Sequence, residues 1–250
     1  MRFYYGAASG GARKALQILQ EPNVMISYAT KHNKPWYGIE NLFVDSGGYS
    51  FMMGQGEYGP VGEYVTYLRR WQPDLYALRD YPCEPDVLEK HGATVEEHQR
   101  KTTEKHIETL DAVGDLDGQP VTVIQGWKTR DYLNHIDQLR DQGIPLDYVA
   151  VGSVCRRNAE IEIERVIRSI RDELPNSKIH AFGVKTSVFN RTAVKDLIDS
   201  ADSLAYEYAS RKNHEKGDWK HQSVEYLKMK KRIEESKPPS RPERQLTGWS

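Results

Sequence analysis

Short apolar runs of strand length recur along this chain of 250 residues, and a polar break followed by a helical pattern separates most of them. These runs predict strands at residues 2–6, 24–29, 42–45, 74–80, 120–126, 147–153, 178–184 and 202–208. The helices predicted between them are 11–20, 61–72, 94–113, 130–142, 159–174, 192–199 and 216–235. Residues 30–41 are too polar for a confident helical pattern.

Alternating strands and helices predict a parallel sheet, because parallel neighbours need a crossover connection. Eight such units in a chain of this length favour closure into an α/β fold of the (β/α)8 TIM-barrel type, as one catalytic domain over residues 1–235. A doubly wound open sheet is the alternative. No G-x-G-x-x-G motif follows the first strand, and this favours the barrel.

The chain changes character at residues 236–250, which begin Ser-Lys-Pro-Pro-Ser-Arg-Pro-Glu-Arg. A segment this rich in proline and positive charge does not form regular structure. We expect a flexible basic tail, or else an arm that becomes ordered against a partner.

Composition excludes several classes of protein. The formal net charge is −1, so any nucleic-acid contact must come from local basic clusters. The two cysteines, Cys83 and Cys155, have no metal-binding spacing. No run of about 18 apolar residues predicts a membrane span, and the N-terminus enters a strand without a signal-peptide profile. We expect a cytoplasmic protein with no membrane partner, no metal and no cofactor.

Polar residues follow most of the predicted strands. In a barrel the carboxyl ends of the strands meet at one mouth, where α/β-barrel enzymes keep their catalytic groups. A lone aspartate after a strand is more often a helix cap, and it is the shared placement that favours a site. The residues placed at this mouth are Asp45, Asp80, Gln125, Gly126, Gly152, Ser153, Lys185 and Asp202.

Five segments resemble the tRNA-guanine transglycosylase superfamily. Phe-Val-Asp-Ser-Gly-Gly-Tyr at residues 43–49 is similar to its Asp-Ser-Gly-Gly-Phe-Gln signature, and Val-Ile-Gln-Gly at 123–126 to its Val-Gln-Gly segment. Ala-Val-Gly at 150–152 and Phe-Gly-Val at 182–184 resemble two further strand ends. Ile-Asp-Ser-Ala-Asp-Ser at 198–203 is similar to the segment that holds the family's nucleophile. The short form looks most like the DpdA branch, which places 7-deazaguanine derivatives in DNA.

The resemblance implies a role for each matching residue. Asp202 would be the nucleophile that attacks C1′ of the target nucleotide, with Glu207 as its rival. Asp45 would be the general acid/base, and Asp80 and Gln125 would recognise the base. Further base-binding residues would be Ser46, Gly47, Gly48, Tyr49, Gly126 and Gly152. A carboxylate nucleophile splits base exchange into two displacements through a covalent intermediate.

The chain departs from the tRNA-acting members in two respects. It lacks the cysteine and histidine cluster of their zinc subdomain, and this favours DNA over tRNA as the polymer. Tyr148 and Ser153 replace a glycine and a glutamate beside the sixth strand, which leaves open whether preQ0, preQ1 or another 7-deazaguanine is the free base. A tRNA-acting enzyme, a base-releasing hydrolase and a non-catalytic nucleic-acid-binding protein remain alternatives, and a homodimer is possible.

Phosphate contacts would come from local basic residues. The candidates are Arg156, Arg157, Lys185, Lys228 and Lys231, together with Lys230, Arg232 and the arginines of the tail. Each has an alternative interpretation, as a strand-end residue, an exposed basic pair or the solvated face of the last helix.

Overall fold

Eight parallel strands form a closed barrel in the computed structural model, which describes residues 1–34, 36–54, 58–155, 157, 159–214 and 218–237. The strands are β1 (Arg2–Gly6), β2 (Asn23–Ser27), β3 (Asn41–Asp45), β4 (Leu75–Ala77), β5 (Gln119–Ile124), β6 (Tyr148–Val151), β7 (Lys178–Ala181) and β8 (Ser200–Ser203). Each strand pairs with the next along the chain, and β1 also pairs with β8. The predicted (β/α)8 barrel is therefore confirmed, and the open sheet is excluded.

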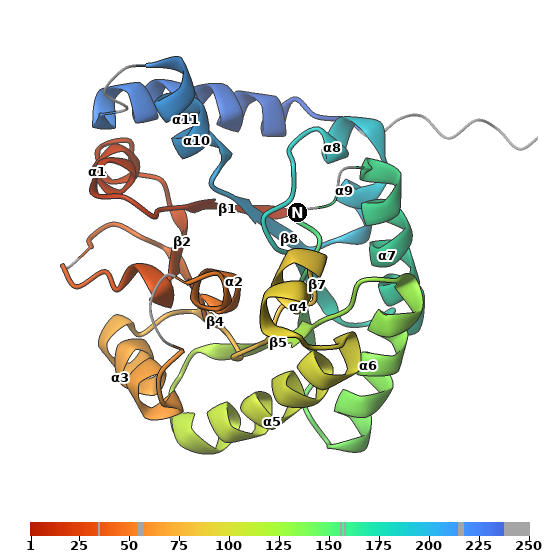
Figure 1. Ribbon diagram of the computed structural model, residues 1–250. Helices are drawn as coiled ribbons and strands as arrows, with labels where there is room; N and C mark the ends of the chain where they lie inside the picture. The colour runs from red at the N-terminus through yellow and green to blue at the C-terminus, as the bar shows by residue number, and fades with distance from the viewer. Residues whose placement is uncertain (35, 55–57, 156, 158, 215–217, 238–250) are drawn as a thin grey trace, which may run out of the picture.

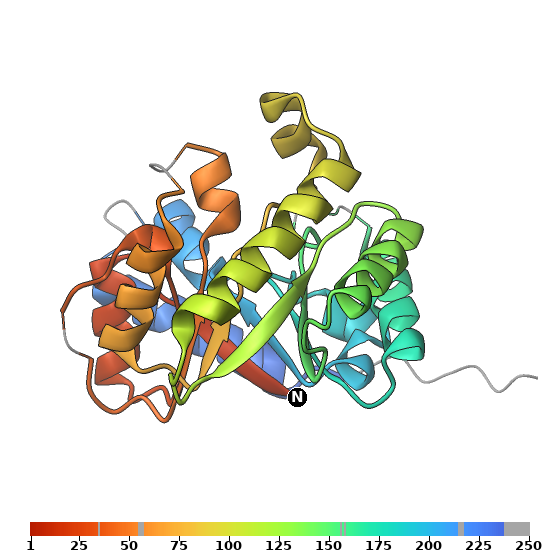
Figure 2. The same cartoon turned by 90° about the horizontal axis from the view of Figure 1, so that it is seen from below.

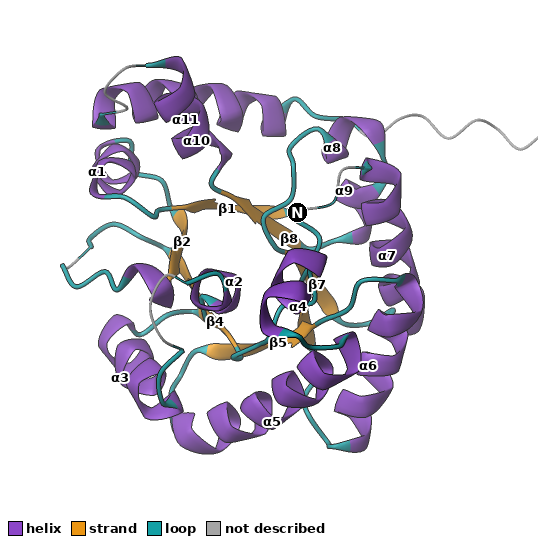
Figure 3. Cartoon of the chain, in the orientation of Figure 1, coloured by secondary structure: helices purple, strands orange, loops and turns teal. Residues whose placement is uncertain are grey.

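Helices surround the strands on the outside of the barrel, and short helices lie over one end of it (Figures 1 and 3). They are α1 (Gly10–Ile18), η1 (Tyr28–Thr30), α2 (Gly48–Met52), α3 (Val61–Trp71), α4 (Pro85–His91), α5 (Val95–Val113), α6 (Thr129–Asp141), α7 (Glu160–Glu173), α8 (Val188–Arg191), α9 (Val194–Leu197), α10 (Ala205–Asn213) and α11 (Trp219–Glu234). The α5 helix begins at a capping box, in which the Thr94 hydroxyl accepts from the Glu97 amide and Glu97 accepts from the Thr94 amide.

Two predicted elements near the C-terminus have wrong bounds. The sequence predicts a strand at residues 202–208. The structure has the short strand β8 instead, which pairs with β1 from Ser200 to Ser203. The Ser203 hydroxyl then accepts from the Ala205 amide, and α10 begins there. The predicted helix 192–199 contains only α9, because Thr192 is extended and Ser200 already belongs to β8. Asp202 therefore lies near the end of its strand rather than at its beginning.

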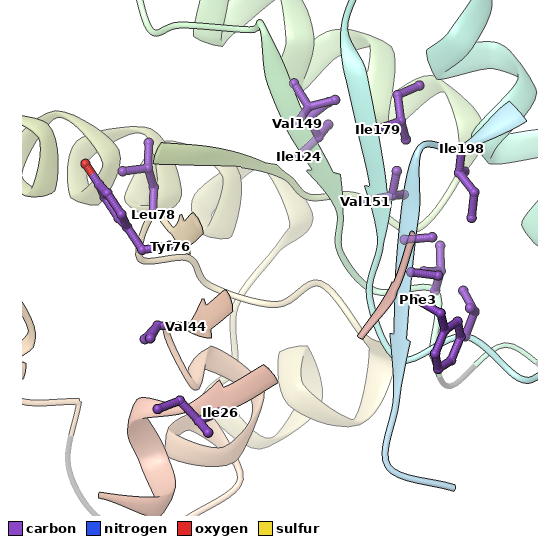
Figure 4. Packing of buried hydrophobic residues seen from close by; sticks show 14 of the residues in the cluster. Phe3, Ile26, Val44, Tyr76, Leu78, Ile124, Val149, Val151, Ile179 and Ile198 are labelled. Carbon is purple, nitrogen blue, oxygen red and sulfur yellow. The ribbon is translucent and has the colours of Figure 1, made fainter. Parts of the chain in front are cut away.

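The core has two parts, set by the alternation of side chains along each strand. Residues such as Phe3, Ile26, Val44 and Val151 face outward and pack under the helices (Figure 4). Their neighbours point inward and fill the barrel with a cluster that includes Tyr4, Met25, Phe43, Val121, Val123 and Ala150. Asp45 lies two residues after the inward Phe43 on the same strand, so it points to the same side. Asp202 is paired across the sheet with the inward Tyr4. Both carboxylates are therefore on the inner face.

One end of the barrel carries the short helices α2 and α4, which follow β3 and β4, while the N-terminus lies at the opposite end (Figures 1 and 2). The covered end is thus the carboxyl end of the strands, where the sequence places the candidate site. At the outer wall, α11 packs against α1 and α10, and Lys195 donates to the Ser236 carbonyl at 2.7 Å. Residues 238–250 lie outside the described residues, so the domain boundary at 235 stays a prediction.

Among the helices of the described residues, none is both long and apolar enough to cross a membrane.

Candidate active site

Asp45 ends β3 beside the turn that leads into α2. Burial raises the pKa of Asp45 to about 6, although the Ser27 hydroxyl and the Gly47 amide hydrogen-bond to the carboxylate and oppose the rise. The negative charge of Asp202 contributes to this rise. Gly47 has a φ of 81°, a left-handed conformation that glycine adopts without strain. This local geometry holds a carboxyl that changes charge close to neutral pH.

The glycines of the motifs allow the residues of the site to approach one another closely. A Cβ atom on Gly48 would lie 2.8 Å from both the carbonyl oxygen and Oδ1 of Asp80. A Cβ atom on Gly152 would lie 2.4 Å from Gln125 Nε2. The glycines therefore have a structural purpose that the sequence does not reveal, because any larger residue would displace Asp80 or Gln125.

Asp80 is the centre of a buried hydrogen-bond cluster. Its Oδ1 accepts from the Ser46 hydroxyl at 2.8 Å, and its Oδ2 accepts from Gln125 Nε2 at 2.6 Å. Burial, together with the nearby charge of Asp45, raises the pKa of Asp80 to about 7. The predicted base-recognition pair, Asp80 and Gln125, is thus in direct contact and shares the site with Asp45.

The cluster continues to a residue that the sequence analysis missed. Gln125 Oε1 lies 2.7 Å from the Ser153 hydroxyl, and the same hydroxyl lies 2.7 Å from Glu84 Oε2. Ser153 has a φ of 54° and also accepts from the Cys83 amide at 2.9 Å. Burial raises the pKa of Glu84. Glu84 precedes α4 in a proline-rich segment, where the sequence indicates a helix cap and gives no signal of a site residue.

Asp202 lies on β8, with 7% of its surface exposed. Its Oδ1 accepts from the Gly183 amide at 2.7 Å and lies 3.2 Å from His180 Nε2. Oδ2 accepts no hydrogen bond from the described residues. One oxygen of this carboxylate is therefore fixed by two neighbours, while the other has no donor among the described residues.

His180 connects Asp202 to a line of hydroxyl groups inside the barrel, and it too was missed. Its Nδ1 lies 2.8 Å from Ser200 Oγ, which lies 2.7 Å from the Tyr148 hydroxyl. A neutral ring that donates from Nε2 to Asp202 must accept at Nδ1, so Ser200 donates to His180 and Tyr148 donates to Ser200. The alternation of β7 could have revealed His180, since it lies two residues before the inward Phe182.

Glu207, the rival nucleophile, lies on α10, where its Oε1 accepts from the Ala8 amide at 2.6 Å. It is thus tied to the loop after β1, whereas Asp202 is held by β7 and the turn after it. The Tyr49 hydroxyl donates to Asp86 Oδ2 at 3.1 Å and links α2 to α4. Gly126 packs against Asp131 and Tyr132 at the beginning of α6.

The predicted phosphate-binding residues are dispersed. Arg157 is buried, with its guanidinium 4.4 Å from the Trp127 ring, so its position indicates packing. Lys185 is exposed after β7, at the mouth. On α11, Lys228 pairs with Glu225 at 2.9 Å and Lys231 lies 3.8 Å from Glu235, which places both on the outer wall. Arg156 lies outside the described residues.

Histidine, cysteine and acidic side chains form no group of three or more placed to hold a metal ion within the described part of the chain.

The raised pKa of Asp45 predicts that ionisation of this residue lowers the free energy of unfolding near neutral pH. Its pKa is about 6 in the folded protein against an ordinary value of 3.8, so the folded state holds this proton more tightly. The contribution of Asp45 to the free energy of unfolding is therefore fully present below about pH 4 and is lost as the pH rises through about 6. Asp45→Asn should make the protein more stable than wild type at pH 7, by on the order of 2 kcal/mol, with little difference at pH 4.

Urea denaturation at the two pH values measures this effect. Asp137→Asn is the matched control, because Asp137 is an exposed aspartate on α6 whose ion pair with Arg140 contributes little. Equal stability of Asp45→Asn and wild type at pH 7 would contradict a buried carboxylate that is costly to ionise.

Comparison with known families gives a match over most of the chain. The family model of DpdA, described as DeoxyPurine in DNA protein A, matches residues 30–250. Curated protein sequences give no match. The match includes β3–β8, with every acidic residue of the site, and it agrees with the branch that the motifs resemble. The chain therefore belongs to the DpdA family.

Proposed function

We propose that this protein exchanges guanine in DNA for a free 7-deazaguanine base through a covalent glycosyl-enzyme on Asp202. Family membership supports a role as a DNA-guanine transglycosylase in general. The observation that carries the finer proposal is the pair of carboxyls at the mouth. Among the described residues, one oxygen of Asp202 has no donor, and Asp202 lies close enough to Asp45 to raise the pKa of that residue.

In the first step, Asp202 Oδ2 attacks C1′ of the target nucleotide as the bond from C1′ to N9 of guanine breaks. Protonated Asp45 gives its proton to the departing base and becomes a carboxylate. A group whose pKa is about 6 has both forms available near neutral pH, as this role requires. Gly183 and His180 hold Asp202 in place during the attack.

In the second step, the incoming base loses its N9 proton to Asp45 and its N9 attacks C1′. The ester bond from C1′ to Asp202 breaks, and Asp202 returns to a carboxylate. Protons and electrons balance over the two steps, and no oxidation or reduction takes place. The target nucleotide must leave the base stack to reach C1′ at the mouth, as in other enzymes that act on bases.

Base recognition falls to Asp80 and Gln125. Guanine and its 7-deaza analogues present N1–H and N2–H donors beside an O6 acceptor, and an ionised Asp80 accepts from such donors. The Gln125 nitrogen has a second hydrogen for O6 beyond the one it gives to Asp80. A base without these donors would place an acceptor or an apolar edge against the buried carboxylate, and the site would bind such a base much more weakly.

Incubation of the protein with labelled preQ0 and either DNA or tRNA tests the proposal. We expect the label to enter DNA and an equal amount of guanine to be released. Entry of the label into tRNA instead would show that tRNA is the polymer substrate, and the proposed chemistry would be unchanged. Release of guanine with no second base present would indicate a hydrolase, and binding of DNA without release or incorporation would indicate a non-catalytic member.

A further inference from the structure

A second buried carboxyl lies one serine away from the predicted base-recognition pair. Glu84 is 2% exposed, and its Oε2 lies 2.7 Å from Ser153 Oγ. The Ser153 hydroxyl lies 2.7 Å from Gln125 Oε1, and Gln125 Nε2 lies 2.6 Å from Asp80 Oδ2. One line of hydrogen bonds therefore joins two carboxyl groups, and the reaction proposed above makes no use of Glu84.

The hydrogens on this line can be counted. Ser153 Oγ accepts from the Cys83 amide, and its hydroxyl has a single hydrogen to donate. If that hydrogen goes to Gln125, the contact with Glu84 needs a hydrogen on Glu84. If it goes to Glu84, the Gln125 carboxamide must turn its NH2 toward Ser153. Its oxygen then faces Asp80, which must supply a hydrogen. In both arrangements one of the two carboxyls holds a proton, since an unmet contact between buried oxygens is costly.

The two arrangements present different surfaces to a base. With the proton on Glu84, Asp80 is ionised and accepts from N1–H of guanine, and the Gln125 nitrogen lies beside Asp80 as a donor. With the proton on Asp80, its hydrogen goes to the Gln125 oxygen, which takes the place of the nitrogen, so that Gln125 presents no donor to O6 of a base. Guanine, with its N1–H donor and O6 acceptor, fits only the first arrangement.

We propose that Glu84 is the proton partner of Asp80, and that a bound guanine places their shared proton on Glu84. This inference rests on the proposed function in taking Asp80 as the residue that faces the base. Glu84 acts through Ser153 and Gln125 and does not touch the base, so it is a positioning residue that selects the guanine-accepting arrangement.

The electrostatic surroundings agree with a proton held on this line. Burial raises the pKa of Glu84, and it raises that of Asp80 to about 7. Other ionisable groups face the pair from each packed element. Those near Glu84 are Cys83, Asp86, Cys155 and Tyr132. The Arg157 guanidinium in turn contacts the Tyr132 hydroxyl. Those near Asp80 are Asp45, Tyr58 and Tyr64. The neighbouring acids repel negative charge, so the first proton to leave the pair leaves the second harder to remove.

Glu84→Gln tests the inference, because a glutamine amide donates to Ser153 at every pH and so fixes Asp80 in the ionised arrangement. Equilibrium dialysis of radiolabelled guanine measures affinity between about pH 5 and pH 9. Wild type should bind best in a limited range near neutral pH, and Glu84→Gln should extend that range by about one pH unit or more. The matched control, Glu89→Gln, changes an exposed glutamate on α4 and should follow wild type.

An infrared titration without any base keeps the inference separate from the proposed function. Near pH 7, wild type and Glu89→Gln should show a band of protonated carboxylic acid that Glu84→Gln lacks, in addition to the smaller contribution of Asp45 that all three share. If no variant binds guanine, the proposed function fails, and the infrared band still decides whether the pair holds a proton. A band that persists in Glu84→Gln, or superimposable guanine profiles for wild type and Glu84→Gln, would overturn the inference. If Glu84→Gln does not fold, wild type can be labelled with ¹³C-glutamate or with ¹³C-aspartate before guanine is added. The carboxylic-acid band that guanine induces should then shift with ¹³C-glutamate. A shift with ¹³C-aspartate alone would overturn the inference.

Discussion

Asp202→Ala is expected to reduce base exchange by at least about 10³-fold, because no other group at this position can form the ester with C1′. The variant should also fail to form a covalent complex with DNA when the second base is withheld. The fold should survive, because the variant keeps the β-ladder with β1 and loses only the contacts that Asp202 makes with Gly183 and His180. Denaturing gel analysis of the protein with labelled DNA measures the complex directly.

Glu207→Gln separates the two candidate nucleophiles. Glu207 lies on the next helix, and its Oε1 contact with the Ala8 amide can be kept by a glutamine oxygen. This variant should retain exchange and the covalent complex. Loss of the complex in Glu207→Gln together with its retention in Asp202→Ala would assign the nucleophile to Glu207 and remove the mechanism proposed for Asp202.

The barrel and the positions of four key residues could be predicted because they depend on local patterns. Period-two alternation and crossover spacing indicate parallel strands, and the ends of parallel strands meet whatever the loops do. Asp45 ends β3, Gln125 follows β5 directly and Asp80 comes three residues after β4, so the barrel brings them to the same end. A strand at 202–208 would begin at Asp202, whereas β8 ends at Ser203, and the register with β1 fixes the inward direction of Asp202.

The residues that support this site could not be predicted from local patterns. Glu84 and Ser153 are 69 positions apart, and neither segment contains a local pattern that predicts their hydrogen bond. It forms because the loop after β4 contacts the loop after β6. The line from Tyr148 to His180 crosses three strands and exists only once the barrel closes. Tyr148 looked like a departure from the family pattern, yet in the fold its hydroxyl supports the residue that orients Asp202.

Asp80→Asn is expected to remove the preference for guanine while leaving the nucleophile in place. An asparagine amide offers either a neutral oxygen or an NH2 group where guanine N1–H needs a carboxylate, and burial leaves no water to compensate. A site built around such a hydrogen bond can discriminate by about 10⁴-fold, so kcat/KM for exchange of guanine should fall by about 10³-fold or more. Competition between labelled guanine and adenine measures the preference.

Adenine presents an acceptor at N1 and a donor at its 6-amino group, the reverse of guanine. Asp80→Asn should therefore narrow the ratio of guanine to adenine binding, whereas Asp137→Asn, on the exposed face of α6, should leave it unchanged. A guanine preference that survives in Asp80→Asn would place base recognition elsewhere. If Asp80→Asn loses the preference while Glu84→Gln keeps it, the carboxylate of Asp80 reads the base, and the proton on Glu84 serves to keep that carboxylate ionised.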